Sequence, residues 1–98
     1  MGEINPGFLV GVTTEGNPVL RGMFYFQGTV GLPLELVLFW LQQKNYVMDW
    51  EDWVFGAFKD GWNPKTIEAR SSSAVLEIYG KTYHEQWSSR MEKLICSL

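Results

Sequence analysis

The residues best suited to chemistry in this sequence are its single histidine, His84, and its single cysteine, Cys96. A cysteine beside a histidine can act as an activated nucleophile, and clusters of such residues bind metal ions. The two lie in one predicted helix, about 18 Å apart along its axis, so we expect neither kind of site there. We expect His84 to be an exposed residue of the first helical turn. We expect Cys96 to be a small buried apolar residue or part of a frayed helix end.

Carboxylates could supply acid–base chemistry, but their positions favour structural roles. Glu51 and Asp52 fall in the first turn of a predicted helix, where negative side chains stabilise the positive end of the helix dipole. Glu35 interrupts an apolar run close to Pro33, which suits the first position of a helix. Glu35 is therefore either another first-turn carboxylate or a buried acid, and no second catalytic group can be named beside it.

Sequence motifs for common catalytic sites are absent. The segment Gly28–Gly31 has neither the spacing nor the lysine of a phosphate-binding loop. No G-x-S-x-G nucleophile motif, zinc ligand set or calcium loop occurs in the sequence. The sequence therefore predicts no catalytic residues, no metal and no cofactor, and a protein that is not an enzyme.

The composition is that of a folded protein, because 46% of the 98 residues are hydrophobic and 15% are aromatic. This length predicts a single domain over residues 1–98. The formal charge of −3 includes no basic cluster, which disfavours nucleic-acid binding. One cysteine cannot form an internal disulfide, and we find neither a signal peptide nor a run of about 20 apolar residues. We therefore expect a cytoplasmic protein that does not bind membranes.

The longest apolar run extends from Leu34 to Leu41, with Glu35 as its only polar member. It predicts a helix over Leu32–Asn45, with Pro33 at its start and a left-handed asparagine at its end. A helix that is apolar all round belongs in a core. We therefore expect a central helix with neighbours on several sides.

Two β-prone runs, Phe8–Thr13 and Val19–Gln27, flank a turn-forming Thr-Glu-Gly-Asn-Pro segment. This pattern predicts an antiparallel β-hairpin. Period-two alternation then places Arg21, Met23 and Tyr25 on one face of the second strand. This mixed face is the first candidate recognition surface, and an uncovered strand edge could pair with another copy of the chain.

Three more helices are predicted after the central one. Asp49 is a candidate cap for the first of them, Asn63 with its following proline opens the next, and Thr82 begins an S/T-x-x-E capping box. The helix after Asp49 carries an apolar stripe at helical spacing, consisting of Trp50, Trp53, Val54, Ala57 and Phe58. The predicted fold class is α+β and mostly helical, with a hairpin over residues 8–27 and a four-helix array over residues 32–98.

The sequence contains more aromatic residues than these stripes use, since Tyr25, Tyr46, Phe55, Trp62 and Tyr83 lie off them. Such residues either complete the core or form an exposed patch. Exposed apolar patches usually mark interaction sites, and aromatic residues with arginine often carry the binding energy.

These patterns favour a protein–protein interaction module, a small adaptor or inhibitor that binds an unknown protein partner and forms a homodimer. The alternative is a small-molecule binding protein, in which aromatic walls and an arginine (Arg21, Arg70 or Arg90) stack a nucleotide or an aromatic metabolite. The candidate partner-binding residues are Arg21, Met23, Tyr25, Phe55 and Trp62.

Overall fold

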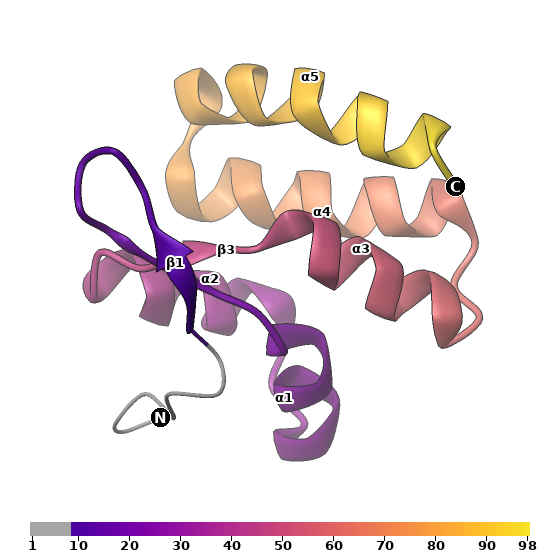
Figure 1. The fold of residues 1–98 in the computed structure, drawn as a ribbon. Helices are drawn as coiled ribbons and strands as arrows, with labels where there is room; N and C mark the ends of the chain where they lie inside the picture. The colour runs from indigo at the N-terminus through magenta and orange to yellow at the C-terminus, as the bar shows by residue number, and fades with distance from the viewer. Residues whose placement is uncertain (1–8) are drawn as a thin grey trace.

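The computed structural model describes residues 9–98, which form a small sheet and five helices (Figure 1). The strands are β1 (Leu9–Val12), β2 (Pro18–Leu20) and β3 (Val47–Met48), in that spatial order. β1 is antiparallel to β2, and β3 is parallel to β2. The helices are α1 (Met23–Val30), α2 (Leu34–Gln43), α3 (Trp50–Lys59), α4 (Pro64–Tyr79) and α5 (Lys81–Cys96). This confirms the predicted fold class, α+β and mostly helical.

The turn between β1 and β2 forms at the predicted Thr-Glu-Gly-Asn-Pro segment. The Thr13 N–H donates to the Asn17 carbonyl at 2.8 Å, and the Asn17 N–H donates to the Thr13 hydroxyl at 3.1 Å. Gly16 has a φ of 86°, in the left-handed region that glycine adopts without a steric penalty. The first predicted strand is therefore found as β1, although its first residue, Phe8, lies outside the described residues.

The second predicted strand, Val19–Gln27, is wrong beyond Leu20. Gly22 has a φ of 77° and turns the chain out of the sheet, so that helix α1 begins at Met23. The Gly22 N–H donates to a carboxylate oxygen of Asp52 in α3 at 2.7 Å, which fixes the start of α1 on that helix. A short apolar run cannot distinguish a strand from a helix by its pattern. In this structure Met23–Val30 is a helix because the segment packs against α3.

The third strand was not predicted, because two residues carry no recognisable alternation. Val47 and Met48 pair with Val19 and Leu20 of β2. The next residue, Asp49, donates its N–H to the Leu20 carbonyl at 2.8 Å. β3 directly precedes α3 in the chain, so its pairing with β2 holds the start of α3 beside the end of the hairpin, although these two segments are far apart in the sequence.

The predicted central helix is shorter and less enclosed than expected. It is found as α2, which buries Leu34, Val37, Leu38 and Leu41 on one face. On the opposite face, Leu36 and Phe39 are 52% and 50% exposed. Three elements, α1, α4 and β3, pack against α2, so it does have several neighbours, but they leave the face with Leu36 and Phe39 uncovered. Asn45 does adopt the predicted left-handed conformation, with a φ of 59°.

Two of the three predicted helix caps are confirmed. The Asp49 carboxylate accepts from the Asp52 N–H at 3.2 Å, and the Asn63 side chain accepts from the Lys65 N–H at 2.8 Å. The predicted Thr82 cap is wrong. Gly80, with a φ of 89°, turns the chain directly from α4 into α5, so α5 already begins at Lys81.

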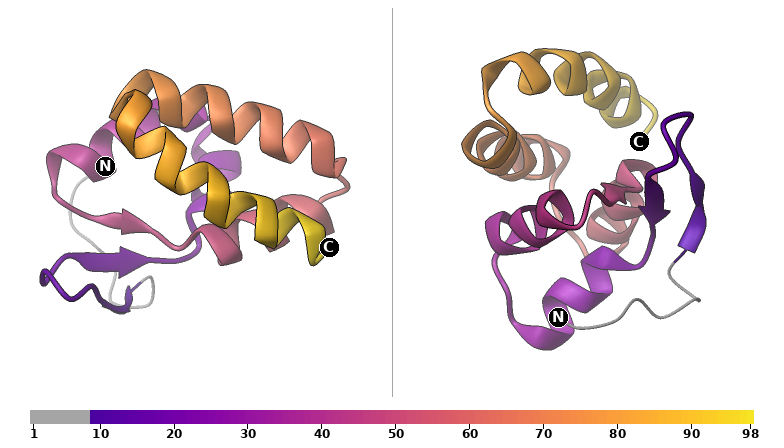
Figure 2. Two further views of the ribbon diagram at one scale, coloured as in Figure 1. Left: turned by 90° about the horizontal axis from the view of Figure 1, so that it is seen from above. Right: turned by 90° about the vertical axis from the view of Figure 1, so that its left-hand side faces the viewer.

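The core lies where α2 and α3 meet the helical hairpin formed by α4 and α5. The sheet lies beside the start of α3, and the C-terminal end of α5 comes near it (Figure 2). Trp53 of α3 is its largest fully buried side chain. The predicted stripe of α3 is buried except at its last member, since Phe58 is 43% exposed. Within residues 9–98, no helix combines the length and the apolar character needed to cross a bilayer.

Candidate functional site

The structure separates the residues predicted to share one recognition surface. Because Met23 and Tyr25 lie in a helix, where neighbours two apart point in different directions, Met23 is buried and Tyr25 is 73% exposed. Arg21 lies in the exposed connection between β2 and α1. The predicted Arg21–Met23–Tyr25 strand face is therefore wrong. Phe55 lies on α3 and is 39% exposed, and Trp62 follows α3 and is half-buried.

Tyr25 and Trp62 do come together, at a shallow hollow between α1 and the end of α3. The hollow has a volume of about 590 Å³. Its aromatic floor is held by edge-to-face contacts, because the Trp62 ring centre lies 5.6 Å from that of Phe24 and 5.9 Å from that of Trp53. Gly56 makes this possible, since a Cβ at that position would lie 3.2 Å from the Phe24 ring. An exposed tyrosine beside a preformed aromatic floor is a surface on which a partner could bind.

A second exposed apolar surface is the edge strand β1. All four of its residues are exposed, including three aliphatic ones: Leu9 at 46%, Val10 at 52% and Val12 at 65%. β1 is the terminal strand of the sheet, so one of its edges has no strand partner among residues 9–98. An exposed apolar edge strand is a template for pairing with another strand.

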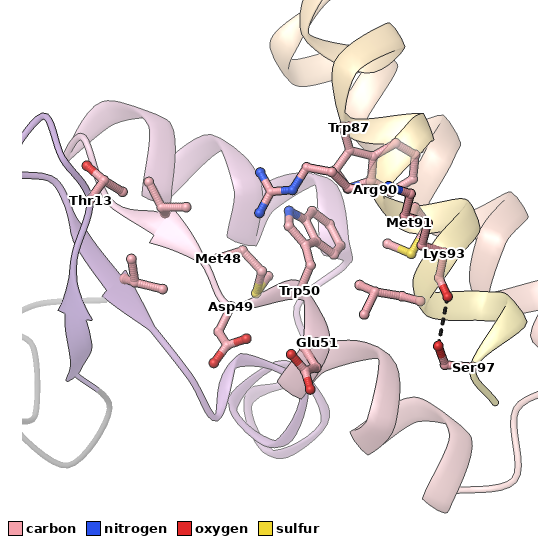
Figure 3. A pocket seen from close by; sticks show the side chains of 13 residues that line it. Thr13, Met48, Asp49, Trp50, Glu51, Trp87, Arg90, Met91, Lys93 and Ser97 are labelled. Atoms are coloured by element: carbon pink, nitrogen blue, oxygen red, sulfur yellow. Dashed lines mark hydrogen bonds between the residues drawn. The ribbon is translucent and has the colours of Figure 1, made fainter.

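A cleft of about 450 Å³ lies between the sheet, the start of α3 and α5 (Figure 3). Its apolar lining includes Trp50 and Trp87, whose ring centres are 5.4 Å apart, together with Met48 and Met91. The Trp87 indole N–H is buried and has no hydrogen-bond partner in the part of the chain that the structure describes. Most buried donors in proteins are bonded, so this indole is an unusual feature of the cleft lining.

Charged side chains of both signs line the same cleft. Figure 3 shows Asp49 and Glu51 at the start of α3, with their carboxylates directed away from the Arg90 guanidinium of α5, and Lys93 lies further along α5. Among residues 9–98, no ion pair joins these carboxylates to Arg90 or Lys93. Asp49 already accepts from the Asp52 N–H, and Glu51, Arg90 and Lys93 are exposed. The cleft therefore has an apolar interior with solvent-exposed charges at its border.

Tyr83 lies near both Arg90 and Trp50, two residues of the cleft lining. Burial raises the pKa of the Tyr83 hydroxyl, while the nearby Arg90 charge and a hydrogen bond from the Trp50 side chain act in the opposite direction. Tyr83 also stacks on Tyr79 across the junction of α4 and α5, with ring centres 4.3 Å apart. Burial, and to a lesser extent Tyr83, raises the pKa of Tyr79. Both hydroxyls therefore remain neutral near pH 7, and Arg90 has no anionic partner there.

His84 has a partner that the sequence analysis missed. Its Nε2 lies 2.7 Å from the Ser72 hydroxyl oxygen, so the expectation of an exposed histidine is wrong. A Ser–His pair can form part of a nucleophilic site. Ser72, however, lies in the interior of α4, where backbone N–H groups bond within the helix and cannot form an oxyanion hole beside it. The pair is better suited to fastening α5 to α4.

The other sequence candidates for chemistry remain isolated. Cys96 is an exposed free thiol in the last turn of α5, which fits the frayed-end alternative and excludes the buried one. Glu35 lies in the first turn of α2, the structural alternative from the sequence. Among the described residues, no three His, Cys, Asp or Glu side chains converge on a possible metal position.

The missed cleft has only a partial sequence signal. Arg90 and Lys93 flank the α5 stripe that contains Trp87 and Met91, so a basic border could be recognised. The facing wall comes from Asp49 and its neighbours, about 40 positions earlier. Nothing in the sequence pattern indicates that these two segments meet.

Comparison of the chain with models of known protein families, with curated proteins and with solved structures finds no match. The function must therefore be inferred from the surfaces of the chain itself.

Proposed function

We propose that the chain is a non-enzymatic protein-interaction module, a small cytoplasmic adaptor or inhibitor that forms a homodimer through β1. The single observation that carries this proposal is that all four residues of a largely aliphatic strand at the edge of the sheet are exposed. Natural proteins usually protect such edges with charges, proline or a covering element, and none of the residues from Leu9 to Val12 is charged or a proline.

A second copy of β1 suits this edge. Antiparallel pairing about a two-fold axis between Val10 and Gly11 would place Leu9 of each copy opposite Val12 of the other copy. Aliphatic pairs opposite each other stabilise a sheet, and no like charges would face each other. A four-residue pairing is small compared with the roughly 800 Å² that each partner buries in a standard interface, so we expect a weak dimer that forms as concentration rises.

The dimer would leave the hollow with Tyr25 and Trp62 available for a partner protein. Aromatic residues are enriched at the energetic centres of interfaces. The exposed Tyr25 ring beside the floor of Phe24 and Trp62 is the best such centre among the predicted partner-binding residues. Met23 is excluded from this role because it is buried.

Light scattering after size exclusion, over a concentration series, tests the homodimer. We expect the average mass to rise from 11.3 kDa toward twice that value. Val10→Lys should keep the protein monomeric, because a lysine on an edge strand disfavours pairing with another strand and replaces an aliphatic side chain of the paired edge. Leu76→Lys is the matched control, since Leu76 is a similarly exposed aliphatic residue on α4. A wild-type monomer at every concentration would contradict the proposal, as would a dimer that Val10→Lys leaves intact.

A further inference from the structure

The hollow with Tyr25 and Trp62 combines an aromatic surface with hydrogen-bond donors. The Gln27 Oε1 accepts from the Trp53 indole N–H at 3.3 Å, and the Gln27 NH2 group has no partner in the described part of the chain. The Trp62 indole N–H also has no partner among residues 9–98, and it is not a buried atom. Water bonds to both groups in the free protein, so they select the ligand while the aromatic surface supplies the affinity.

The backbone around the hollow has no free donors for pairing with a strand. The Gly31 and Leu32 N–H groups both donate to the Gln27 carbonyl, at 2.9 and 3.2 Å. The Trp62 N–H donates to the Ala57 carbonyl at 3.0 Å. A peptide that binds here therefore cannot form a β-ladder, and it must bind through its side chains and through acceptors that reach the two side-chain donors.

We propose that this hollow binds a proline-rich segment of the partner protein in the polyproline II conformation. This inference rests on the proposed interaction function and names the class of its partner. A polyproline II segment forms no internal hydrogen bonds, so its carbonyls point outward, and proline has no N–H that would need an acceptor. Its carbonyls match the Gln27 and Trp62 donors, and its rings pack on Tyr25 and Phe24, as proline-rich segments do in aromatic-lined grooves.

The same features disfavour other kinds of segment. The carbonyls of a helix are bonded within the helix, so a helix in the hollow would displace water from the Gln27 and Trp62 donors without replacing its hydrogen bonds. Asp60 is the only charged residue that lines the hollow. It is exposed to solvent and contributes little affinity, but it favours a neutral or basic proline-rich segment over an acidic one.

Titration of the 15N-labelled protein with an N-acetylated, C-amidated decaproline peptide tests the proposal by NMR. The indole N–H signal of Trp62 should shift as the peptide binds, whereas the signals of the buried Trp40 and Trp87 indoles should not. A decamer of D-proline is the matched control peptide, because it forms the mirror-image, right-handed helix and should bind at least about tenfold more weakly. Absence of binding by decaproline, or equal binding of the two decamers, would overturn the proposal.

Two variants assign the contacts. Tyr25→Ala should weaken decaproline binding about tenfold, because it removes an exposed aromatic contact. Gln27→Glu keeps an oxygen for the Trp53 indole but removes the NH2 donor, so it should weaken binding about fivefold. Phe39→Ala is the matched control, since Phe39 is an exposed aromatic residue on α2, outside the hollow. Equal losses for Tyr25→Ala and Phe39→Ala would overturn the assignment, and thermal unfolding checks that each variant remains folded.

The titration distinguishes this inference from the proposed homodimer. None of the residues that line the hollow belongs to β1. Val10→Lys should therefore bind decaproline with the affinity of the wild type, although it is expected to be monomeric. Loss of peptide binding in Val10→Lys would place the peptide on β1 and overturn the inference. A wild-type monomer that binds decaproline through Trp62 would contradict the homodimer alone.

Discussion

Met23 and Tyr25 are two residues apart and have opposite environments. Met23 is 3% exposed and belongs to the core, whereas Tyr25 is the most exposed of the large apolar side chains among the described residues. Successive helical residues are rotated by about 100° around the axis, so positions two apart point in nearly opposite directions. A residue that stabilises the core and a candidate binding residue therefore lie on opposite faces of the same helical turn.

Substitution of these two residues should affect stability very differently. We expect Met23→Ala to lower the free energy of unfolding by about 2–4 kcal/mol, because it removes a buried side chain and leaves a cavity. Tyr25→Ala should change it by less than about 0.5–1 kcal/mol. Urea unfolding followed by circular dichroism measures both values. Similar losses for the two variants would contradict the helical assignment of this segment.

Helix α1 depends on a glycine at its start and tolerates one in its interior. Gly22 has a positive φ, and its N–H donates to Asp52 of α3. Gly28 lies within α1, and a Cβ at that position would meet no other atom within 4 Å. The same residue type therefore has a required role at one position and carries an avoidable entropic cost at the other.

Replacing each glycine by alanine should produce effects of opposite sign. Gly22→Ala should destabilise the protein by about 1–2 kcal/mol, because alanine is strained at positive φ. Gly28→Ala should stabilise it by roughly 0.5–1 kcal/mol, because alanine restricts the unfolded chain and favours the helix. Thermal unfolding of both variants provides the comparison. Destabilisation by both substitutions would argue against a helix at Met23–Val30.

At the scale of the whole molecule, three surfaces lie on different elements. The β1 edge belongs to the sheet, the hollow with Tyr25 lies between α1 and α3, and the charged cleft lies between α3 and α5. The fold therefore presents three surfaces that are separate from one another.

Hydrogen exchange at two protein concentrations should identify the surface used for self-association. We expect exchange of backbone amides in Leu9–Val12 to slow at high concentration, because new inter-strand hydrogen bonds protect them. Amides of α1 should show no such change, and Val10→Lys should abolish the effect in β1. Concentration-dependent protection confined to another element, such as α2 with its exposed Leu36 and Phe39, would place the contact elsewhere.

The sequence by itself determined the features that depend on local chemistry. Asp49 and Asn63 cap helices because their side chains accept from N–H groups two or three residues away. Asn45 and Gly16 stop or turn the chain because they tolerate positive φ. These interactions need no distant partner, so the helical class, the first turn and most helix boundaries could be predicted.

The tertiary structure decided the features that depend on which segments meet. The run after Gly22 is a helix because it packs on α3, and one face of α2 is exposed because only the other face is covered. Asp49 and Arg90 line one cleft through packing that no spacing rule encodes. Such contacts arise from the burial of surfaces far apart in sequence, and burial is non-directional, so a local pattern cannot specify its partner.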